Sequence, residues 1–333
     1  MSVTSICGFA VVTCSVLLTP GVAIAQDTAQ ESEPEALVDA LNDVFGKHAG
    51  KRAAHPKGIC VKGSFTPTAA APSLTKAPVF AAPVPLVGRF SLAGGNPAAS
   101  DSQQDNARGF AMHFNLPDGS TTDLVLISAP VFVAKTPEDF LALLHAVTPG
   151  PDGKPDAKKV EAYFSAHPES KRQGEWLKAH PVPASYASAD YYSVHAFDLT
   201  NAKGDKQAIK WKVVPKTSEP GLTADEAKTK GSDFYAGELK DRLAKGPAKF
   251  DLIAVLGEPG DPEDDPTVDW PQDKRKQVKM GVITISGEEP DASCDAGIFD
   301  PNNLADGIEA PPGDKILPMR SLDYAVSYGR RVN

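Results

Sequence analysis

The feature of the sequence that most restricts its fold is a series of short apolar or alternating segments separated by turn-forming residues. Alternation with a period of two, bounded by Gly, Asn or Asp, is typical of β-strands. Candidate strands lie at residues 87–92, 109–116, 123–128, 191–199, 207–214, 251–256 and 277–285. Proline supplies 30 of the 333 residues, about twice the usual share of roughly 5%, which favours non-helical chain.

Candidate helices come in blocks between these strands, at residues 35–48, 136–147, 156–180, 223–244 and 315–328. The second has a start signal at Thr136 and Asp139, and the third is interrupted around Pro168. The last has Asp314 as its cap and Pro318 in its first turn. Runs of strands with helices in blocks predict an antiparallel α+β fold rather than βαβ repeats.

The first 25 residues have the composition of a cleaved signal peptide. They contain no charged side chain, their apolar run is short for a membrane span, and Ala23 and Ala25 form a small-x-small cleavage pattern. We therefore expect export to the periplasm or the medium, with residues 26–333 as the mature domain. The alternative is an uncleaved membrane anchor. No other window of the sequence is apolar enough for stable membrane insertion.

The sequence lacks the motifs of several common kinds of functional site. The net charge of −9 argues against nucleic acid as a partner. The seven histidines form no zinc motif, and neither a serine-hydrolase elbow nor a phosphate-binding glycine loop occurs. After removal of the leader, Cys60 and Cys294 remain. They form no CxxC motif, and whether they pair is left open by the sequence.

The C-terminal candidate helix carries the clearest chemical pattern. Arg320 and Tyr324 are four residues apart and share a face, and Arg331 lies about two turns beyond Tyr324. An arginine beside a tyrosine can hydrogen-bond the phenol oxygen and favour its ionised form. A phenolate is a known axial ligand of haem iron. The alternative is a helix with exposed arginines and a tyrosine that only packs in the core.

Further motifs extend this pattern to a family resemblance. The segment 300–309, followed by Arg320 and Tyr324, resembles the proximal haem segment of catalases, and residues 52–58, which include His55, resemble their distal-histidine segment. On its own, His55 reads as a surface residue of a basic loop. Further ordered matches are residues 89–91, 108–111, 123–125, 130–132, Phe140, 192–204 and 265–270. The chain is most similar to the short, exported catalase-related peroxidases of this superfamily.

The resemblance implies a fold and a cofactor. The fold is an antiparallel eight-stranded catalase-type β-barrel with surrounding helices, which lacks the C-terminal helical domain of large catalases. Residues 26–333 would form this haem-binding domain, and the cofactor would be haem b. A shortened arm suggests a monomer or a small homo-oligomer.

The resemblance also implies a role for each site residue. His55 would be the distal acid–base group, oriented by Ser91, and Tyr324 would be the axial ligand of the iron, stabilised by Arg320. Further cofactor-binding residues would be Arg52, Arg89 and Arg331 against the haem propionates, and Phe132 and Phe140 near the haem face. Simple core packing is the alternative for the two phenylalanines.

One departure from catalases bears on the reaction. The distal Asn-Asn pair of catalases aligns with Ile127 and Ser128, so a second peroxide should be harder to hold. We expect a haem peroxidase that reduces hydrogen peroxide or organic peroxides with a small-molecule electron donor, and weak dismutation at most. The alternatives are a fatty-acid hydroperoxide lyase or isomerase of the same fold, and a non-catalytic haem-binding protein. The donor and the preferred peroxide are not specified by the sequence.

Overall fold

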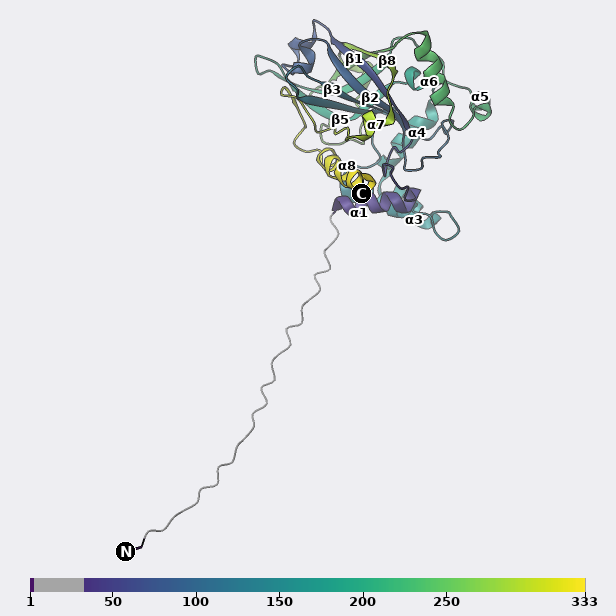
Figure 1. The fold of residues 1–333 in the computed structure, drawn as a ribbon, viewed down its shortest axis with the longest axis vertical. Helices are drawn as coiled ribbons and strands as arrows, with labels where there is room; N and C mark the ends of the chain where they lie inside the picture. Colours follow the sequence, from purple (N-terminus) through teal and green to yellow (C-terminus); the bar gives the residue numbers. More distant parts are fainter. Residues whose placement is uncertain (3–32, 333) are drawn as a thin grey trace. The chain divides into compact units, whose positions relative to one another are not determined.

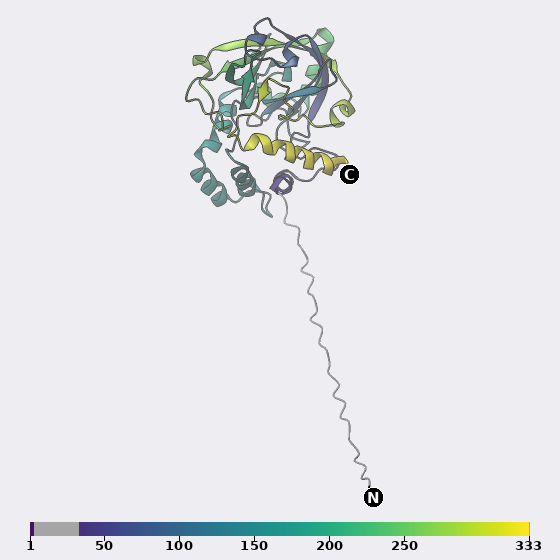
Figure 2. The ribbon, with the colours of Figure 1, turned by 90° about the vertical axis from the view of Figure 1, so that its left-hand side faces the viewer.

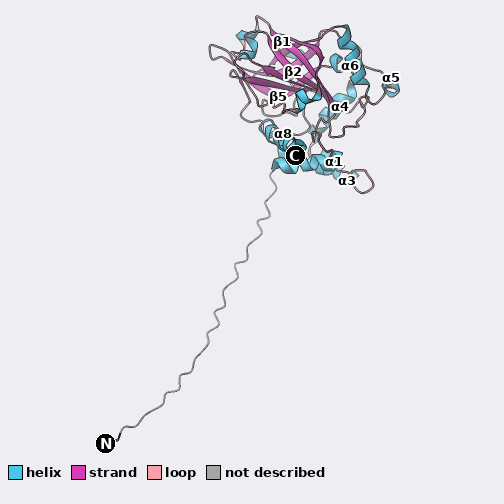
Figure 3. Ribbon diagram, viewed as in Figure 1, coloured by secondary structure: helices cyan, strands magenta, loops and turns pink. Residues whose placement is uncertain are grey.

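The computed structural model describes residues 1–2 and 33–332, so the predicted signal peptide lies almost wholly outside the described residues. Strands form the centre of the fold and helices lie around them (Figures 1 and 3). Their bounds are β1 Gly58–Pro67, β2 Val84–Leu92, β3 Arg108–Asn115, β4 Thr121–Ile127, β5 Tyr191–Thr200, β6 Lys206–Pro215, β7 Ala248–Leu256, β8 Gln277–Glu288 and β9 Ile308–Glu309.

The first eight strands close into an antiparallel barrel, as predicted. Neighbours follow the order β4-β3-β2-β1-β8-β7-β6-β5, and β5 returns to β4 where Tyr192 pairs with Ile127. The short β9 adds to the outer edge of β5. Buried aromatic rings fill the barrel, and Phe90 stacks on Phe110 with ring centroids 4.3 Å apart. Closure therefore brings β4 and β5 together at one mouth of a filled barrel.

Helices lie outside the barrel. Their bounds are α1 Glu33–Phe45, α2 Pro137–Val147, α3 Ala157–Ala166, α4 Arg172–Ala179, α5 Ala224–Thr229, α6 Phe234–Lys245, α7 Asp291–Asp295 and α8 Ile316–Val332, and 3₁₀ turns span Ala71–Ser73, Pro78–Phe80, Pro168–Lys171, Tyr186–Ser188 and Gln272–Lys274. Figure 2 shows α8 between the barrel and α1. An ion pair between Arg330 and Asp39 joins these two helices. Both of the predicted caps form, since the Thr136 hydroxyl accepts from Asp139 N and Asp314 accepts from Leu317 N.

Two sequence expectations were incomplete. Strand β1 was not predicted, because its apolar alternation is weak and its ladder shifts register between Lys62 and Gly63. A Cβ on Gly63 would lie 2.1 Å from the carbonyl oxygen of Thr284, so only glycine fits there. The predicted helix at residues 223–244 is two helices, because the segment around Gly231 interrupts it between α5 and α6.

The question of cysteine pairing is answered by the structure. Cys60 in β1 and Cys294 in α7 form a disulfide across 234 positions of sequence, with Cα atoms 5.8 Å apart. Both residues are almost fully buried. The bridge ties the segment that follows His55 to the segment that leads into α8.

Removal of this bridge should destabilise the fold. We expect Cys60→Ser with Cys294→Ala to lower the free energy of unfolding by about 2–5 kcal/mol, because the bridge closes a long loop in the unfolded chain. Urea denaturation of the oxidised, reduced and double-variant proteins would measure this change. Identical midpoints for the oxidised and reduced proteins would contradict the assignment of a structural bridge.

Candidate functional site

A cavity of about 440 Å³ lies at the barrel wall beneath the terminal helices. Strands β2 to β5 supply one side, and α1, α2 and α8 supply the other through mostly apolar side chains. All of the site residues predicted from the sequence line it, namely Arg52, His55, Arg89, Ser91, Phe132, Phe140, Arg320, Tyr324 and Arg331. Residues from both ends of the chain thus meet in one place.

His55 is held in an unusual backbone conformation. Its φ of 57° lies in the left-handed region, which is disfavoured for residues other than glycine. Its amide donates to Gly94 O at 2.7 Å, and Arg89 donates to the carbonyl oxygens of His55 at 2.9 Å and Pro56 at 3.1 Å. These bonds offset the strain, so Arg89 positions the loop that carries the imidazole.

The imidazole of His55 is neutral over the physiological range. Burial, assisted by the charges of Arg89, Arg320 and Arg52, lowers its pKa to about 3. Its Nδ1 atom lies 2.9 Å from Ser91 Oγ, as predicted. A neutral imidazole has one N–H and one bare nitrogen, so it can accept a proton at one moment and return it at the next.

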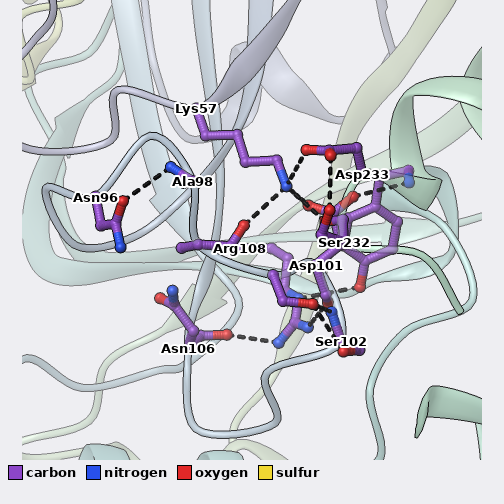
Figure 4. Close-up of polar contacts among 12 residues, drawn as sticks. Lys57, Asn96, Ala98, Asp101, Ser102, Asn106, Arg108, Ser232 and Asp233 are labelled. Carbon is purple, nitrogen blue, oxygen red and sulfur yellow. Dashed lines mark hydrogen bonds and ion pairs between the residues drawn. The ribbon is translucent and has the colours of Figure 1, made fainter.

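A polar network next to His55 anchors the same loop (Figure 4). The Lys57 ammonium forms ion pairs with Asp101 at 2.7 Å and Asp233 at 2.8 Å. It also donates to the carbonyl oxygens of Ala99 and Ser232, at 2.8 and 2.7 Å. Lys57 therefore fixes the chain two residues after His55 to a neighbouring loop and to the start of α6.

The Tyr324 phenol accepts two hydrogen bonds from Arg320, one helical turn before it. Arg320 donates to the phenol oxygen of Tyr324 from Nε at 3.1 Å and from Nη2 at 2.6 Å. The predicted proximal segment holds their helix, because Asn302 donates to Leu317 O and Ser321 Oγ at 2.6 and 2.7 Å. The phenol oxygen thus faces the cavity in a fixed position beside a permanent positive charge.

Two predicted cofactor-binding arginines are fixed by the α7 segment. Arg52 pairs with Asp295 and donates to Cys294 O at 2.8 Å. Arg331 donates to the carbonyl oxygens of Asp295 and Gly297, at 3.1 and 2.8 Å. Both guanidinium groups remain at the cavity wall. The rings of Phe132 and Phe140 lie 5.2 Å apart and belong to the apolar cluster shared with α1 and α8.

Two further ionisable residues, His195 and Asp323, line this cavity but were not predicted from the sequence. His195 is 2% exposed and lines the cavity, with Nδ1 2.5 Å from Asp314 and no described partner at Nε2. Burial lowers the pKa of His195 despite this carboxylate. Asp323 also lines the cavity, and burial raises its pKa to about 7. A lone histidine in a strand and an acid in a helix carry no motif that marks them.

Ile127 and Ser128, which align with the distal Asn-Asn pair of catalases, are placed differently in the structure. Ile127 lines the cavity and brings an apolar surface to it. The Ser128 hydroxyl is engaged elsewhere, since it accepts from Arg108 N at 2.9 Å. The wall at this point therefore offers an aliphatic side chain where catalases have an amide.

Gly109 leaves the space that the Ser91–His55 pair requires. A Cβ at this position would lie 2.4 Å from Ser91 Oγ and 3.0 Å from His55 Nδ1. We expect Gly109→Ala to lower the free energy of unfolding by about 1–3 kcal/mol through overpacking. Adding Ser91→Ala should restore part of this loss by removing the closest clash. Urea denaturation of both single variants and the double variant tests this, and additive losses would argue against the contact.

Known proteins resemble this chain along most of its length. The family model described as catalase matches residues 33–333. A protein of Synechococcus elongatus named catalase-related peroxidase is 37% identical over 326 residues, covering 97% of this chain and 95% of that protein. A protein of the same name from Mycolicibacterium paratuberculosis is 36% identical over 300 residues, covering 88% and 93%.

Solved structures show the same fold. A fungal catalase superposes with a TM-score of 0.76 at 21% identity, covering 86% of this chain and 60% of that one. Catalase A of Saccharomyces cerevisiae superposes with a TM-score of 0.75 at 21% identity, covering 86% and 62%. The chain thus spans about three fifths of the length of these catalases. With its matching family model and full-length relatives, the chain belongs to the catalase family.

Proposed function

We propose that this protein is an exported haem peroxidase that reduces hydrogen peroxide or organic peroxides with electrons from an external donor. One observation carries the proposal: a single cavity holds a neutral buried imidazole, His55, and a phenol, Tyr324, that two bonds from Arg320 fix in place. The names of the two relatives support peroxide as the substrate.

The residues of the cavity fit a haem group. The cavity volume of about 440 Å³ lies within the roughly 300–1,000 Å³ typical of cofactor sites. The cavity walls are mostly apolar with a few polar groups. Tyr324 would ligate the iron, and the guanidinium groups of Arg52 and Arg331 suit the propionates. Haem b is favoured over a thioether-linked haem, because Cys60 and Cys294 are consumed by the disulfide and the sequence has no CxxCH motif.

The residues of the chain supply proton transfer and positioning. Bound haem would supply the electrons that cleave the peroxide O–O bond. His55 takes the proton from one peroxide oxygen and delivers it to the other, so that water or an alcohol departs rather than an anion. Ser91 keeps the ring oriented, and Arg89 holds the loop that carries it. Arg320 stabilises negative charge on the Tyr324 oxygen through its two hydrogen bonds.

Two features support export. The first 25 residues have the pattern of a signal peptide, and the Cys60–Cys294 disulfide is typical of an oxidising compartment. None of the helices that the structure describes has the length and apolar composition of a membrane span. We infer that residues 26–333 act as one haem-binding domain after cleavage.

The proposed ligand is tested by its absorption spectrum. We expect the protein to purify with haem, and Tyr324→Phe to lose the haem or shift its Soret band, because the variant has no phenol oxygen. Tyr328→Phe is the matched control, since Tyr328 lies on the same helix as Tyr324 but does not line the cavity, and its hydroxyl donates to Ala296 O at the end of α7. An unchanged spectrum in Tyr324→Phe would overturn the assignment. Peroxide turnover only with a donor separates a peroxidase from a lyase or a passive haem carrier.

Weak dismutation follows from the aliphatic wall. We expect Ile127→Asn to raise oxygen evolution from hydrogen peroxide by about tenfold, the value of one new hydrogen bond of about 1.4 kcal/mol to a second peroxide. Ile127→Leu is the control for altered packing. Oxygen evolution by the unmodified protein at a rate equal to its donor oxidation would contradict the proposal.

A further inference from the structure

A pair of redox-active rings leads from the cavity to the surface. Tyr192 lies where β5 closes against β4, lines the cavity and is 7% exposed. Its ring packs edge-on against Trp176 of α4, with centroids 5.7 Å apart. Trp176 stacks on His180, with centroids 4.1 Å apart, and His180 is exposed to solvent. Tyrosine and tryptophan are the side chains that most readily lose one electron reversibly.

Trp176 lies only one layer of side chains behind the cavity. It packs against a small buried cluster that includes Ala107, and Ala93 and Ile127 pack against the same cluster. Ala93, Ala107 and Ile127 all line the cavity. The indole N–H of Trp176 donates to Ser128 O at 3.3 Å. Trp176 itself is half-buried, so it lies between the buried cluster and the surface.

The phenol of Tyr192 has a proton acceptor at hand. Its hydroxyl donates to Asp190 Oδ2 at 3.3 Å. Lys212 completes the cluster, with its ammonium 5.3 Å above the Tyr192 ring and 3.6 Å from Asp190. Burial raises the pKa of Tyr192, so the ring is protonated and must release a proton when it loses an electron. Asp190 can hold that proton within the pair.

We propose that Tyr192 and Trp176 form an electron route through which one-electron donors too large to enter the cavity are oxidised at the surface beside His180. The inference rests on the proposed peroxidase function and adds a second donor site to it. Donors small enough to enter the cavity would not need this route.

The steps balance with peroxide as the oxidant. Tyr192 gives one electron towards the oxidised centre in the cavity and its phenol proton to Asp190. Trp176 gives one electron to the Tyr192 radical, which takes the proton back from Asp190. A donor at the surface gives one electron to Trp176. Two such rounds, with two protons from solvent, reduce one hydrogen peroxide to two waters and oxidise two donor molecules by one electron each.

A second chain of aromatic rings is less suited to this role. It runs from Phe110 at the cavity through Phe90 and Tyr186 to Tyr235. Its first two members are phenylalanines, which are much harder to oxidise, and both tyrosines are fully buried. The Tyr235 hydroxyl donates to a backbone carbonyl, Pro183 O, which is a poor proton acceptor. This chain therefore provides a control variant, Tyr186→Phe.

The radicals themselves provide the first test. Haem-loaded protein is mixed with hydrogen peroxide without a donor, frozen within milliseconds and measured by electron paramagnetic resonance. We expect a tryptophan-type radical that changes when the indole is deuterated. Trp176→Phe should convert it to a tyrosyl signal, Trp176→Phe with Tyr192→Phe should abolish both, and Tyr186→Phe should change neither. A signal unaffected in the first two variants would overturn the route.

Two donors provide the second test. Reduced cytochrome c is too large for the cavity, whereas hydroquinone can enter it. We expect Trp176→Phe to lower peroxide-driven oxidation of cytochrome c by about tenfold or more and that of hydroquinone by less than about twofold. Equal losses for both donors would indicate a merely structural role and overturn the inference. Oxidation of hydroquinone but not cytochrome c by the unmodified protein would also overturn it and leave the peroxidase function standing. Oxidation of neither donor would refute the peroxidase function itself.

Discussion

The placement of β1 between β2 and β8 is the constraint on which the site depends. β1 begins at Gly58, three residues after His55. It pairs on one edge with β2, the next strand along the chain, and on the other edge with β8, the last strand of the barrel. The Cys60–Cys294 bridge repeats this connection covalently. Because α8 follows α7 and β9 in the chain, the pairing of β1 with β8 and the Cys60–Cys294 bridge help to bring His55 and Tyr324 to one cavity. The site is therefore a consequence of barrel topology rather than of any local segment.

Positive charge organises the cavity and restricts what its acid–base groups can do. Arg89, Arg320 and Arg52 all disfavour protonation of His55, and burial acts in the same direction. The His55 imidazole is consequently neutral at physiological pH and has a nitrogen free of a proton. The carboxylate of Asp314 makes two contacts near the cavity. It caps α8 and hydrogen-bonds His195 Nδ1. One acidic side chain thus links the start of α8 to a second buried imidazole.

Much of this organisation could be predicted from the sequence, and the failures have physical causes. Period-two alternation identified seven of the eight barrel strands, because each has one face in the core. It missed β1, because Gly63 lies at a shift in the strand register and against the backbone of Thr284, where a regular strand would have an alternating apolar side chain. Arg320 and Tyr324 were found because helical spacing makes them neighbours. His195 was missed because its partner, Asp314, is 119 positions away, a separation at which only tertiary structure creates the contact.

The exchange of an amide for Ile127 links the two halves of the proposed chemistry. In the cavity, its aliphatic surface offers no hydrogen bond to a second peroxide, which supports the proposal that an external donor supplies the reducing electrons. Ile127 and Trp176 pack against the same small apolar cluster, and the indole N–H of Trp176 donates to the carbonyl of Ser128, the residue after Ile127. An asparagine at this position would place a polar group against that apolar cluster, where it would need a hydrogen-bond partner. An aliphatic side chain at position 127 is thus compatible both with the proposed lack of a second peroxide site and with the indole near the cavity wall.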